Sequence, residues 1–317
     1  LADLILARFQ GVPDLELQME LYASLEQLEQ VKTDPEAFKS GLRAFHDNIV
    51  AAAEARGEYG KIPLEVSLYK ADVFWNSLYL FVLGFLLCGV TWMAPRQRWL
   101  WWLAWACVLG GFTLDVYGIT MRCIIRERPP VVTLYDTILF ITSSIVLVSL
   151  LMEWLTKQRI ALPVAAILGA AGMFFAGKYE LEEIKSAGDT MASVVAVLDT
   201  NYYLAIHVTT IALGYAGGLL AGGLAHVWVL AKLFGFRKND KSFYQGLTRM
   251  TYGVVCFSLL FAVFGTIMGG VWANDSCGRF WGWDPKENGA LLICLLFLVV
   301  LHARMGGYIR EHGFMVM

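Results

Sequence analysis

The feature that most constrains this chain is a series of long apolar segments that begins at Phe74 and continues almost to the C-terminus. An α-helix needs about 20 mainly apolar residues to cross the hydrocarbon core of a bilayer. Seven segments fit this pattern, although the last is short: 74–93, 99–119, 134–153, 160–177, 203–233, 251–271 and 289–304. The pattern predicts an all-α fold, a polytopic membrane bundle of about seven transmembrane helices.

Composition supports the same class. The 317 residues are 57% hydrophobic and only 16% charged, whereas soluble domains carry about a quarter charged residues. The mean hydropathy is +0.56. A formal net charge of -2 gives no positive field for nucleic acid, so we expect membrane lipid and not nucleic acid as the surrounding partner.

Residues 1–72 differ from the rest, with thirteen Asp and Glu against seven Lys and Arg and no long apolar run. Segment 15–31 has apolar residues at helical spacing, and segment 34–57 opens with Asp-Pro and closes at Gly. We therefore expect a small acidic helical region outside the membrane at 1–72, and a membrane domain at 73–310. The chain begins with Leu1 and closes with 311–317 after a loop-like stretch, so either end is a possible truncation, with 311–317 treated as a truncated C-terminal end.

The distribution of basic residues predicts the orientation. The connections after the first, third, fifth and seventh spans carry eleven Lys and Arg, and those after the second, fourth and sixth carry seven. The positive-inside rule places the first set in the cytoplasm. The acidic region, the connection 178–200 and the segment 271–289 are then expected on the extracytoplasmic side.

Segment 271–289, here called the tryptophan segment, has an unusual concentration of aromatic residues. Trp272, Trp281 and Trp283 fall within twelve residues, and Phe280 stands beside them. An aromatic belt at the membrane interface is one explanation. The clustering in one glycine-containing loop favours another, a stacking platform for a planar ligand.

The charged residues that follow allow two interpretations. Asp284 before Pro, with Glu287 three residues on, has the spacing of a helix N-cap and need do no more than start the seventh helix. Lys286 is either a solvated loop charge or a partner for an anionic group of a ligand.

Histidines within membrane spans are functional candidates because ionisable groups are costly there. His207 lies at the outer end of the fifth span, on the side of the tryptophan segment. His226 follows nineteen residues later, roughly 28 Å along a helix and close to the opposite face. His302 lies at the inner end of the seventh span. An iron porphyrin suits this set, because it is flat and apolar, carries anionic propionates and takes a neutral imidazole as axial ligand. The basic residues Arg128, Arg279 and Lys286 either meet the propionates or anchor the chain at the interface.

The six cysteines form no Cys-x-x-Cys pair, so a zinc site or a thioredoxin-like redox motif is not expected. Four of them lie in apolar runs, where cysteine is usually a small core residue.

Three stretches resemble a known family. "WGWDPKE", with a Trp about ten residues earlier, resembles the WWD domain of haem-handling proteins. "RPPVVTLYDTILF" (128–140) and "LAIHVTTIALGYA" (204–216) resemble segments of the CcsA (ResC) cytochrome c biogenesis family, whose relatives are CcmC and CcmF. The resemblance covers about residues 73–310.

The resemblance implies a cytochrome c synthase component, in which haem b is carried to the outer face of the membrane and attached to the CxxCH motif of apocytochrome c. It implies a holocytochrome c synthase (haem lyase) formed with a CcsB (ResB) partner, thiol-reducing proteins that keep the client cysteines reduced, and a bacterial inner (plasma) membrane location. The chemistry needs no nucleophile from this chain, so no catalytic residue is expected. Two alternatives stay open: a CcmC-type haem delivery protein without synthase activity, and a membrane transporter for another amphipathic ligand.

The resemblance also implies site residues. His207 matches one axial ligand of the external haem, and His302 matches the ligand of an inner haem. The haem face would lie against Trp272, Trp281 and Trp283, with Asp284 in the same motif. Cys277 stands where the family commonly has a Trp, and a disulfide with Cys123 is an open alternative for this thiol. His226 matches no family position, and either packs between helices or serves as an inner ligand.

Overall fold

The structure is a computed structural model that describes residues 15–94, 96–192, 198 and 202–317. Within these ranges every regular element is a helix, which confirms the all-α prediction. The chain divides into two units, one up to Ser67 and one from Leu68 to Met317.

The first unit contains two antiparallel helices, α2 (Leu15–Gln30) and α3 (Pro35–Ala55), joined by a short turn. Asp34 begins α3, because its side chain accepts hydrogen bonds from the amides of Glu36 and Ala37. A 3-10 turn, η1 (Tyr59–Lys61), leads into α4 (Ile62–Ala71). The described part of the acidic region, from Leu15 onward, is therefore helical, as its sequence predicts.

Seven helices of the described chain are long and apolar enough to cross a membrane, which confirms a multi-pass architecture. The first of these seven runs from Tyr59 to Met93 and comprises η1, α4 and α5. The membrane-length helices are α5 (Val73–Met93), α6 (Arg98–Arg126), α7 (Leu134–Thr156), α8 (Ala161–Ala187), α9 (Tyr202–Leu233), α10 (Lys241–Cys277) and α11 (Pro285–Met305).

Several of these helices extend beyond the apolar segments that predict them. The clearest case is α10, which begins at Lys241 although its apolar run starts near residue 251. Its first turns are amphipathic, and they bury Phe243, Tyr244 and Leu247 in the core. Hydropathy alone does not detect such turns, because half of their residues are polar.

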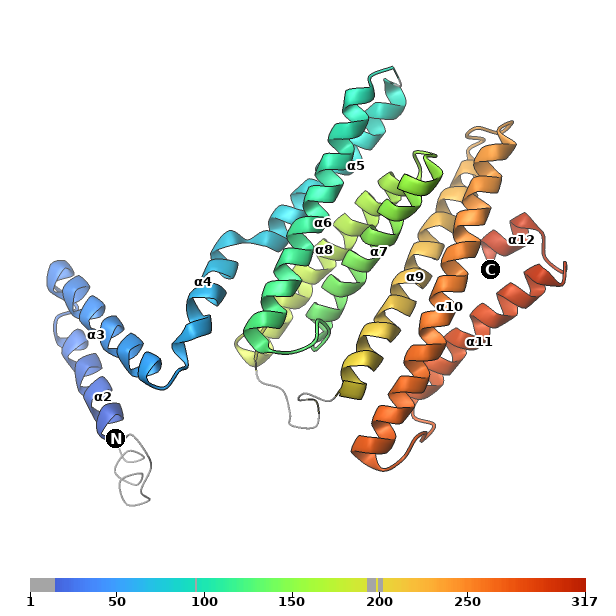
Figure 1. Ribbon diagram of the computed structural model, residues 1–317. Coiled ribbons are helices and arrows are strands. Elements are labelled where there is room, and N and C mark those ends of the chain that lie inside the picture. Colours follow the sequence, from blue (N-terminus) through green and yellow to red (C-terminus); the bar gives the residue numbers. More distant parts are fainter. Residues whose placement is uncertain (1–14, 95, 193–197, 199–201) are drawn as a thin grey trace. The chain divides into compact units, whose positions relative to one another are not determined.

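The long helices alternate in direction, so the bundle has two ends (Figure 1). One end holds the end of α10 and the start of α11, with the tryptophan segment between them, and we call it the tryptophan end. The opposite end carries Lys157, Arg159, Arg237 and Lys238, and we call it the basic end.

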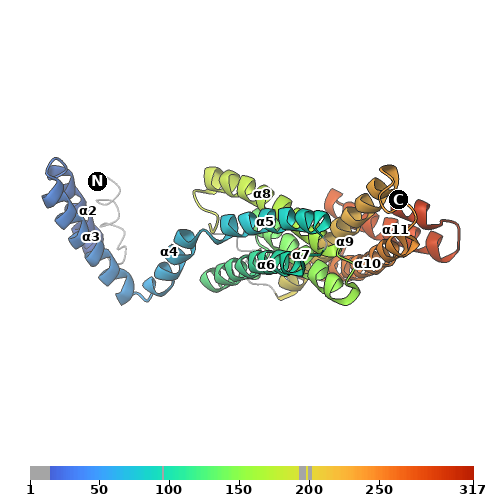
Figure 2. The same ribbon diagram turned by 90° about the horizontal axis from the view of Figure 1, so that it is seen from above.

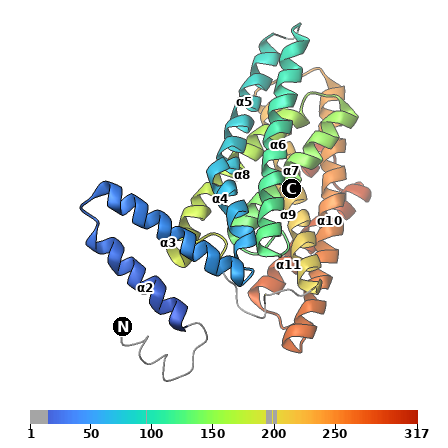
Figure 3. The ribbon, with the colours of Figure 1, turned by 60° about the vertical axis from the view of Figure 1, so that its left-hand side comes forward.

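Helices α5 to α8 form a four-helix group, against which α9 packs mainly through α7 (Figure 2). The α9–α10 pair is the most extensive helix contact, and α11 lies against α10 (Figure 3). Two buried clusters result, one centred on Phe81 and Leu139, the other on Leu224 and Leu247.

Small residues explain the close approach of α9 and α10. A methyl group on Gly214 would lie 2.8 Å from the backbone nitrogen of Ala262, and one on Gly265 would lie 2.7 Å from that of Ile211. Ser258 adds a cross-helix hydrogen bond of 2.6 Å to the carbonyl of Gly214. Small interfacial residues of this kind are how membrane helices pack closely.

The C-terminal end of the chain, after the loop-like stretch, forms a short helix, α12 (Glu311–Val316). Phe314 and Met315 are buried against α9 and its neighbours. His312, for which the sequence suggests no role, lies beside the indole of Trp228 with ring centroids 5.6 Å apart.

Candidate functional site

The tryptophan segment is mostly helical. Residues 271–277 are the last turns of α10 and 285–289 the first turn of α11, so only 278–284 form a loop. Trp272 therefore lies on a helix and not in the loop that its sequence suggests. The loop turns at Gly278 and Trp283, which have φ of +70° and +58°. A left-handed tryptophan is uncommon and needs local support.

That support comes from a reciprocal cap at the start of α11. The Asp284 carboxylate accepts 2.9 Å hydrogen bonds from the amides of Lys286 and Glu287. The Glu287 carboxylate accepts hydrogen bonds from the amides of Gly282 (2.7 Å) and Asp284 (3.2 Å). The amide group of Asn288 donates to the carbonyl of Trp283. The capping role predicted for Asp284 and Glu287 is confirmed.

Two of the tryptophans line a groove between α10 and α11. Trp281 and Trp283 meet edge to face, with ring centroids 6.0 Å apart and planes at 84°. The groove has a volume of about 450 Å³ and its other walls include Phe280, Thr266 and Leu298. Trp283 is 68% exposed, so much of its ring surface is free for a ligand.

His207 is held against α10 rather than against the loop. Its Nδ1 lies 2.7 Å from the carbonyl oxygen of Gly265. A carbonyl only accepts, so Nδ1 carries the proton and Nε2 keeps its lone pair. The ring also fills the space beside Gly269, where a methyl group would come within 2.6 Å of Cε1. The histidine is thus fixed in the tautomer that ligates a metal through Nε2.

The predicted site residues divide between two faces of α10. Trp272 follows Gly265 by two helical turns, so it lies on the face that meets α9 and His207. Trp281 and Trp283 line the groove on the face toward α11, whose lining includes neither His207 nor Trp272. Phe280 packs on Gly270, next to the boundary between these faces.

His302 and His226 lie far from this end. His302 follows the groove residue Leu298 by one turn, and its Nδ1 lies 2.8 Å from the Leu298 carbonyl. His226 makes the equivalent contact with Gly222 at 2.7 Å. Both are exposed on the bundle surface, and each has Nε2 free for a partner outside the described chain.

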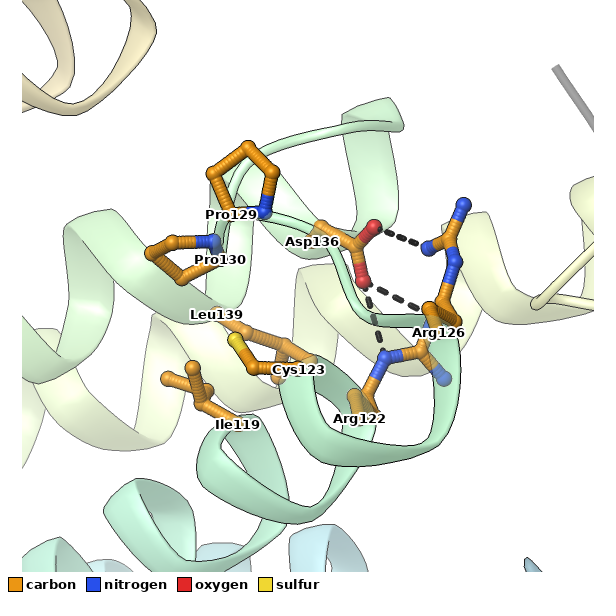
Figure 4. Close-up of a pocket in the computed structure, with 8 residues that line it drawn as sticks. All are labelled: Ile119, Arg122, Cys123, Arg126, Pro129, Pro130, Asp136 and Leu139. Carbon is orange, nitrogen blue, oxygen red and sulfur yellow. Dashed lines mark hydrogen bonds and ion pairs between the residues drawn. The ribbon is translucent and has the colours of Figure 1, made fainter. Parts of the chain in front are cut away.

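The segment "RPPVVTLYD" contributes Asp136 to a buried ionic cluster at the same end (Figure 4). Asp136 accepts from Arg122 at 2.8 Å and from Arg126 at 2.7 Å, and the three side chains are only 6–7% exposed. Thr133 caps α7 in a reciprocal pair with Asp136. The hollow beside them, next to Pro129 and Pro130, is about 10 Å³. It has room for one water and no organic ligand.

Arg122 extends this cluster to the end of α8. It donates to the hydroxyl and the carbonyl of Thr190 at 3.0 and 2.9 Å. Tyr69 donates a 2.7 Å hydrogen bond to the neighbouring Asp189. Burial raises the pKa of Asp189, but hydrogen bonds from Tyr69 and from the amides of Met191 and Thr190 outweigh it and lower the pKa below its usual value.

Sequence reasoning missed this cluster, although one signal was readable. Thr133 and Asp136 have the spacing of a capping box ahead of an apolar run. The pairing of Asp136 with arginines ten and fourteen residues earlier has no such signal. The alternative of a Cys123–Cys277 disulfide is contradicted, because all six cysteines are free.

The fold and site together define a multi-pass helical membrane protein with an aromatic groove and an oriented histidine at one end of the bundle. The sequence profile of the cytochrome C assembly protein family matches residues 131–314. The chain belongs to this family, and its resemblance to CcsA-type cytochrome c biogenesis proteins is confirmed.

Relatives with curated descriptions agree with this family assignment. The chain is 28% identical over 197 residues to the protein NrfI of Wolinella succinogenes, a match that covers 61% of this chain and 21% of NrfI. It is 29% identical over 222 residues to CcsA of Atropa belladonna, covering 59% of this chain and 68% of that protein. It is 36% identical over 116 residues to CcsA of Chlamydomonas reinhardtii, covering 35% and 32%. The matched part is thus about a fifth of NrfI and about two thirds of the Atropa protein.

Proposed function

We propose that this chain is a haem-handling component of cytochrome c maturation. In this proposal it carries haem b to the outer face of the membrane and presents it for attachment to the CxxCH motif of apocytochrome c. The observation that carries the proposal is the membership of the cytochrome c assembly family, joined to a metal-ready His207 and an aromatic groove at one end of the bundle.

The chemistry of the tryptophan end supports a haem substrate. The Nε2 lone pair of His207 is free for iron, because Nδ1 donates to Gly265. Trp281 and Trp283 offer apolar ring surface for a macrocycle. In this assignment Trp272 contacts the haem from the His207 side, and Asp284 acts by holding the loop rather than by touching the haem.

The groove between α10 and α11 supports a route for haem from the basic end to the tryptophan end. Its wall on α11 includes Leu291, Leu295 and Leu298, and His302 follows on the same side of the helix. Eleven residues of helix separate Leu291 from His302, roughly 16 Å. We propose that His302 holds haem before transfer, with a second ligand from a CcsB (ResB) partner.

The attachment step requires this chain to position the haem, and it requires no nucleophile from this chain. Each client cysteine adds its sulfur to one vinyl carbon of haem and its hydrogen to the other, so the addition consumes no oxidant or reductant. The chain would hold the haem edge toward the client and keep the iron ligated. Thiol-reducing proteins would supply the client with both cysteines reduced. The proposed location is the bacterial inner membrane, with the tryptophan end outside.

The test is an absorption spectrum of the purified protein, oxidised and dithionite-reduced, for wild type and His207→Ala. We expect haem b bands in the wild type and less bound haem in the variant, with partial recovery on adding imidazole. His226→Ala is the matched control, because His226 lies on the same helix and matches no family position.

A second measurement separates the rival functions. Cytochrome c yield is measured after co-expression with apocytochrome and a CcsB-type partner only. Normal haem binding with no cytochrome would favour a CcmC-type delivery protein. A colourless wild-type protein from haem-replete cells would contradict the proposal and favour a transporter for another amphipathic ligand.

A further inference from the structure

A second groove opens at the basic end, between the last turns of α7 and the first turns of α10. Its volume is about 500 Å³. It shares no residue with the groove beside the tryptophans. Its lining changes from polar to apolar along the helices, so it is built for an amphipathic occupant.

The polar part of this groove lies nearest the basic end and carries an uncompensated charge. Arg249 is exposed, and within the described residues it has neither an acidic partner nor a hydrogen bond. Gln158 also lines the groove; its Oε1 is buried against Gly246 and has no hydrogen-bond partner in the described chain. Thr156, Ser242 and Gln245 add further polar groups. A single exposed cation among polar side chains at this end of the groove favours an anionic polar group as the occupant.

The apolar part has the depth of one lipid leaflet. From Arg249 to Phe257 the groove follows eight residues of α10, and from Thr156 to Val148 eight residues of α7. Each stretch is roughly 12 Å long, against about 15 Å for half of the hydrocarbon core. Met152, Met250 and Val254 line it, so its walls suit a flexible alkyl chain.

We propose that this groove binds one anionic phospholipid, with its phosphate on Arg249 and an acyl chain along Met152 and Phe257. Leu155 at its rim is 65% exposed, so the groove opens sideways toward the lipid phase. Basic pockets between transmembrane helices at the cytoplasmic side are suited to anionic lipid headgroups. The proposal does not depend on haem handling, since none of its residues belongs to the haem site.

The lining favours a lipid over haem. The groove contains no histidine, so an iron porphyrin would find only methionine thioethers as axial ligands. It contains one cation, which matches one phosphate better than two propionates.

Two variants test the site in different ways. Arg249→Gln removes the charge. Gly253→Leu adds an apolar side chain to the groove wall, and no protein atom lies within 4 Å of its first carbon, Cβ. The matched controls are Lys238→Gln, a cation at the same end outside the groove, and Gly222→Leu, an equally open glycine on α9.

The measurement is the Tm of the purified protein in mixed micelles that contain phosphatidylglycerol or phosphatidylcholine with identical chains. We expect phosphatidylglycerol to raise the Tm of the wild type and of both controls more than phosphatidylcholine does. In Arg249→Gln and Gly253→Leu this difference between the lipids should shrink roughly threefold or more.

Four results would overturn the proposal. The lipids could stabilise the wild type equally, or the difference could persist in both groove variants. sn-Glycerol 3-phosphate alone could reproduce the shift, which would make the ligand a soluble phosphate. Bound haem could fall in both groove variants while the lipid difference stays, which would assign the groove to haem carboxylates.

Discussion

At the residue scale, the polar side chains of the tryptophan end bind partners on other elements and thereby fix the helix ends. Asp136 on α7 holds Arg122 and Arg126 on α6, and Arg122 in turn holds Thr190 beyond α8. Tyr69, on the helix that leads into α5, closes the cluster on Asp189. The ends of α4, α6, α7 and α8 are therefore tied together by charge-assisted hydrogen bonds, which are stronger than neutral ones.

Removing the centre of this cluster should be costly. Asp136→Ala leaves two guanidinium groups buried without their carboxylate, and loss of one partner in a buried ion pair costs about 3–5 kcal/mol. Asp240→Ala, which removes a half-exposed cap, should cost about 1 kcal/mol. Unfolding of the purified variants in SDS titrations measures both losses of stability. Equally small losses in the two variants would contradict a stabilising role for the buried ion pairs of Asp136.

Asp189 gives the cluster a defined acid sensitivity. Its pKa is lowered in the folded chain, so its stabilising contribution is complete above its unfolded pKa of about 4 and is lost as the pH falls through the folded value. The Tm difference between wild type and Asp189→Asn should therefore be largest near neutral pH and shrink below about pH 4. A difference that stays constant down to pH 3 would show that the carboxylate charge is not involved.

At the element scale, α9 and α10 approach so closely that their glycines position the histidine. Gly265 supplies the carbonyl that orients His207, and Gly269 leaves the space that its ring occupies. The sequence predicts His207 and Trp272 as site residues. It does not predict the glycines, because a glycine in a membrane helix gives no sign of which neighbour it faces.

Gly269→Ala should displace the His207 ring, because the new methyl group would lie 2.6 Å from Cε1. We expect lower haem retention and a changed Soret band, with a loss of stability of about 1–3 kcal/mol. Gly222→Ala adds a methyl group in open space on α9, the helix that carries His207, and serves as the control. If Gly269→Ala has the spectra of the wild type, the His207 ring can move away from the added methyl group without a change at the haem.

Helix number was predictable from the sequence, and helix length was not. A run of about 20 apolar residues is a strong signal. The extra turns of α6, α8 and α10 carry charged residues, and they are helical because tertiary contacts bury one side of each. The division of the tryptophans between α10 and the groove was also unpredictable, since the sequence does not show that α10 continues through Trp272 to Cys277.

At the scale of the whole molecule, the alternating direction of the seven long helices places each functional candidate at or toward either the tryptophan end or the basic end. His207, the tryptophan groove and the Arg122 cluster share one end, whereas His302 and the groove at Arg249 lie toward the other. The membrane orientation decides what each end meets. The bias of basic residues predicts that the tryptophan end is extracytoplasmic.

Thiol labelling tests this orientation. Cys277 is exposed at the tryptophan end, while Cys88, Cys107 and Cys294 are buried. In intact spheroplasts a membrane-impermeant maleimide should label Cys277 in the wild type. A Cys123→Ser, Cys277→Ser, Ser242→Cys protein, with its new thiol at the basic end, should be labelled only after permeabilisation. The reverse pattern would invert the topology.

The cap at the start of α11 has a mechanical consequence. Glu287 belongs to the helix but holds the backbone on both sides of Trp283, so loop and helix move as one body. Only Cys294 and Leu301 of α11 are buried, and this helix packs mainly on α10. Any force applied at His302 would therefore displace Trp281 and Trp283 at the far end. Tryptophan fluorescence that changes when a ligand binds His302, and stays unchanged in Glu287→Ala, would reveal this transmission.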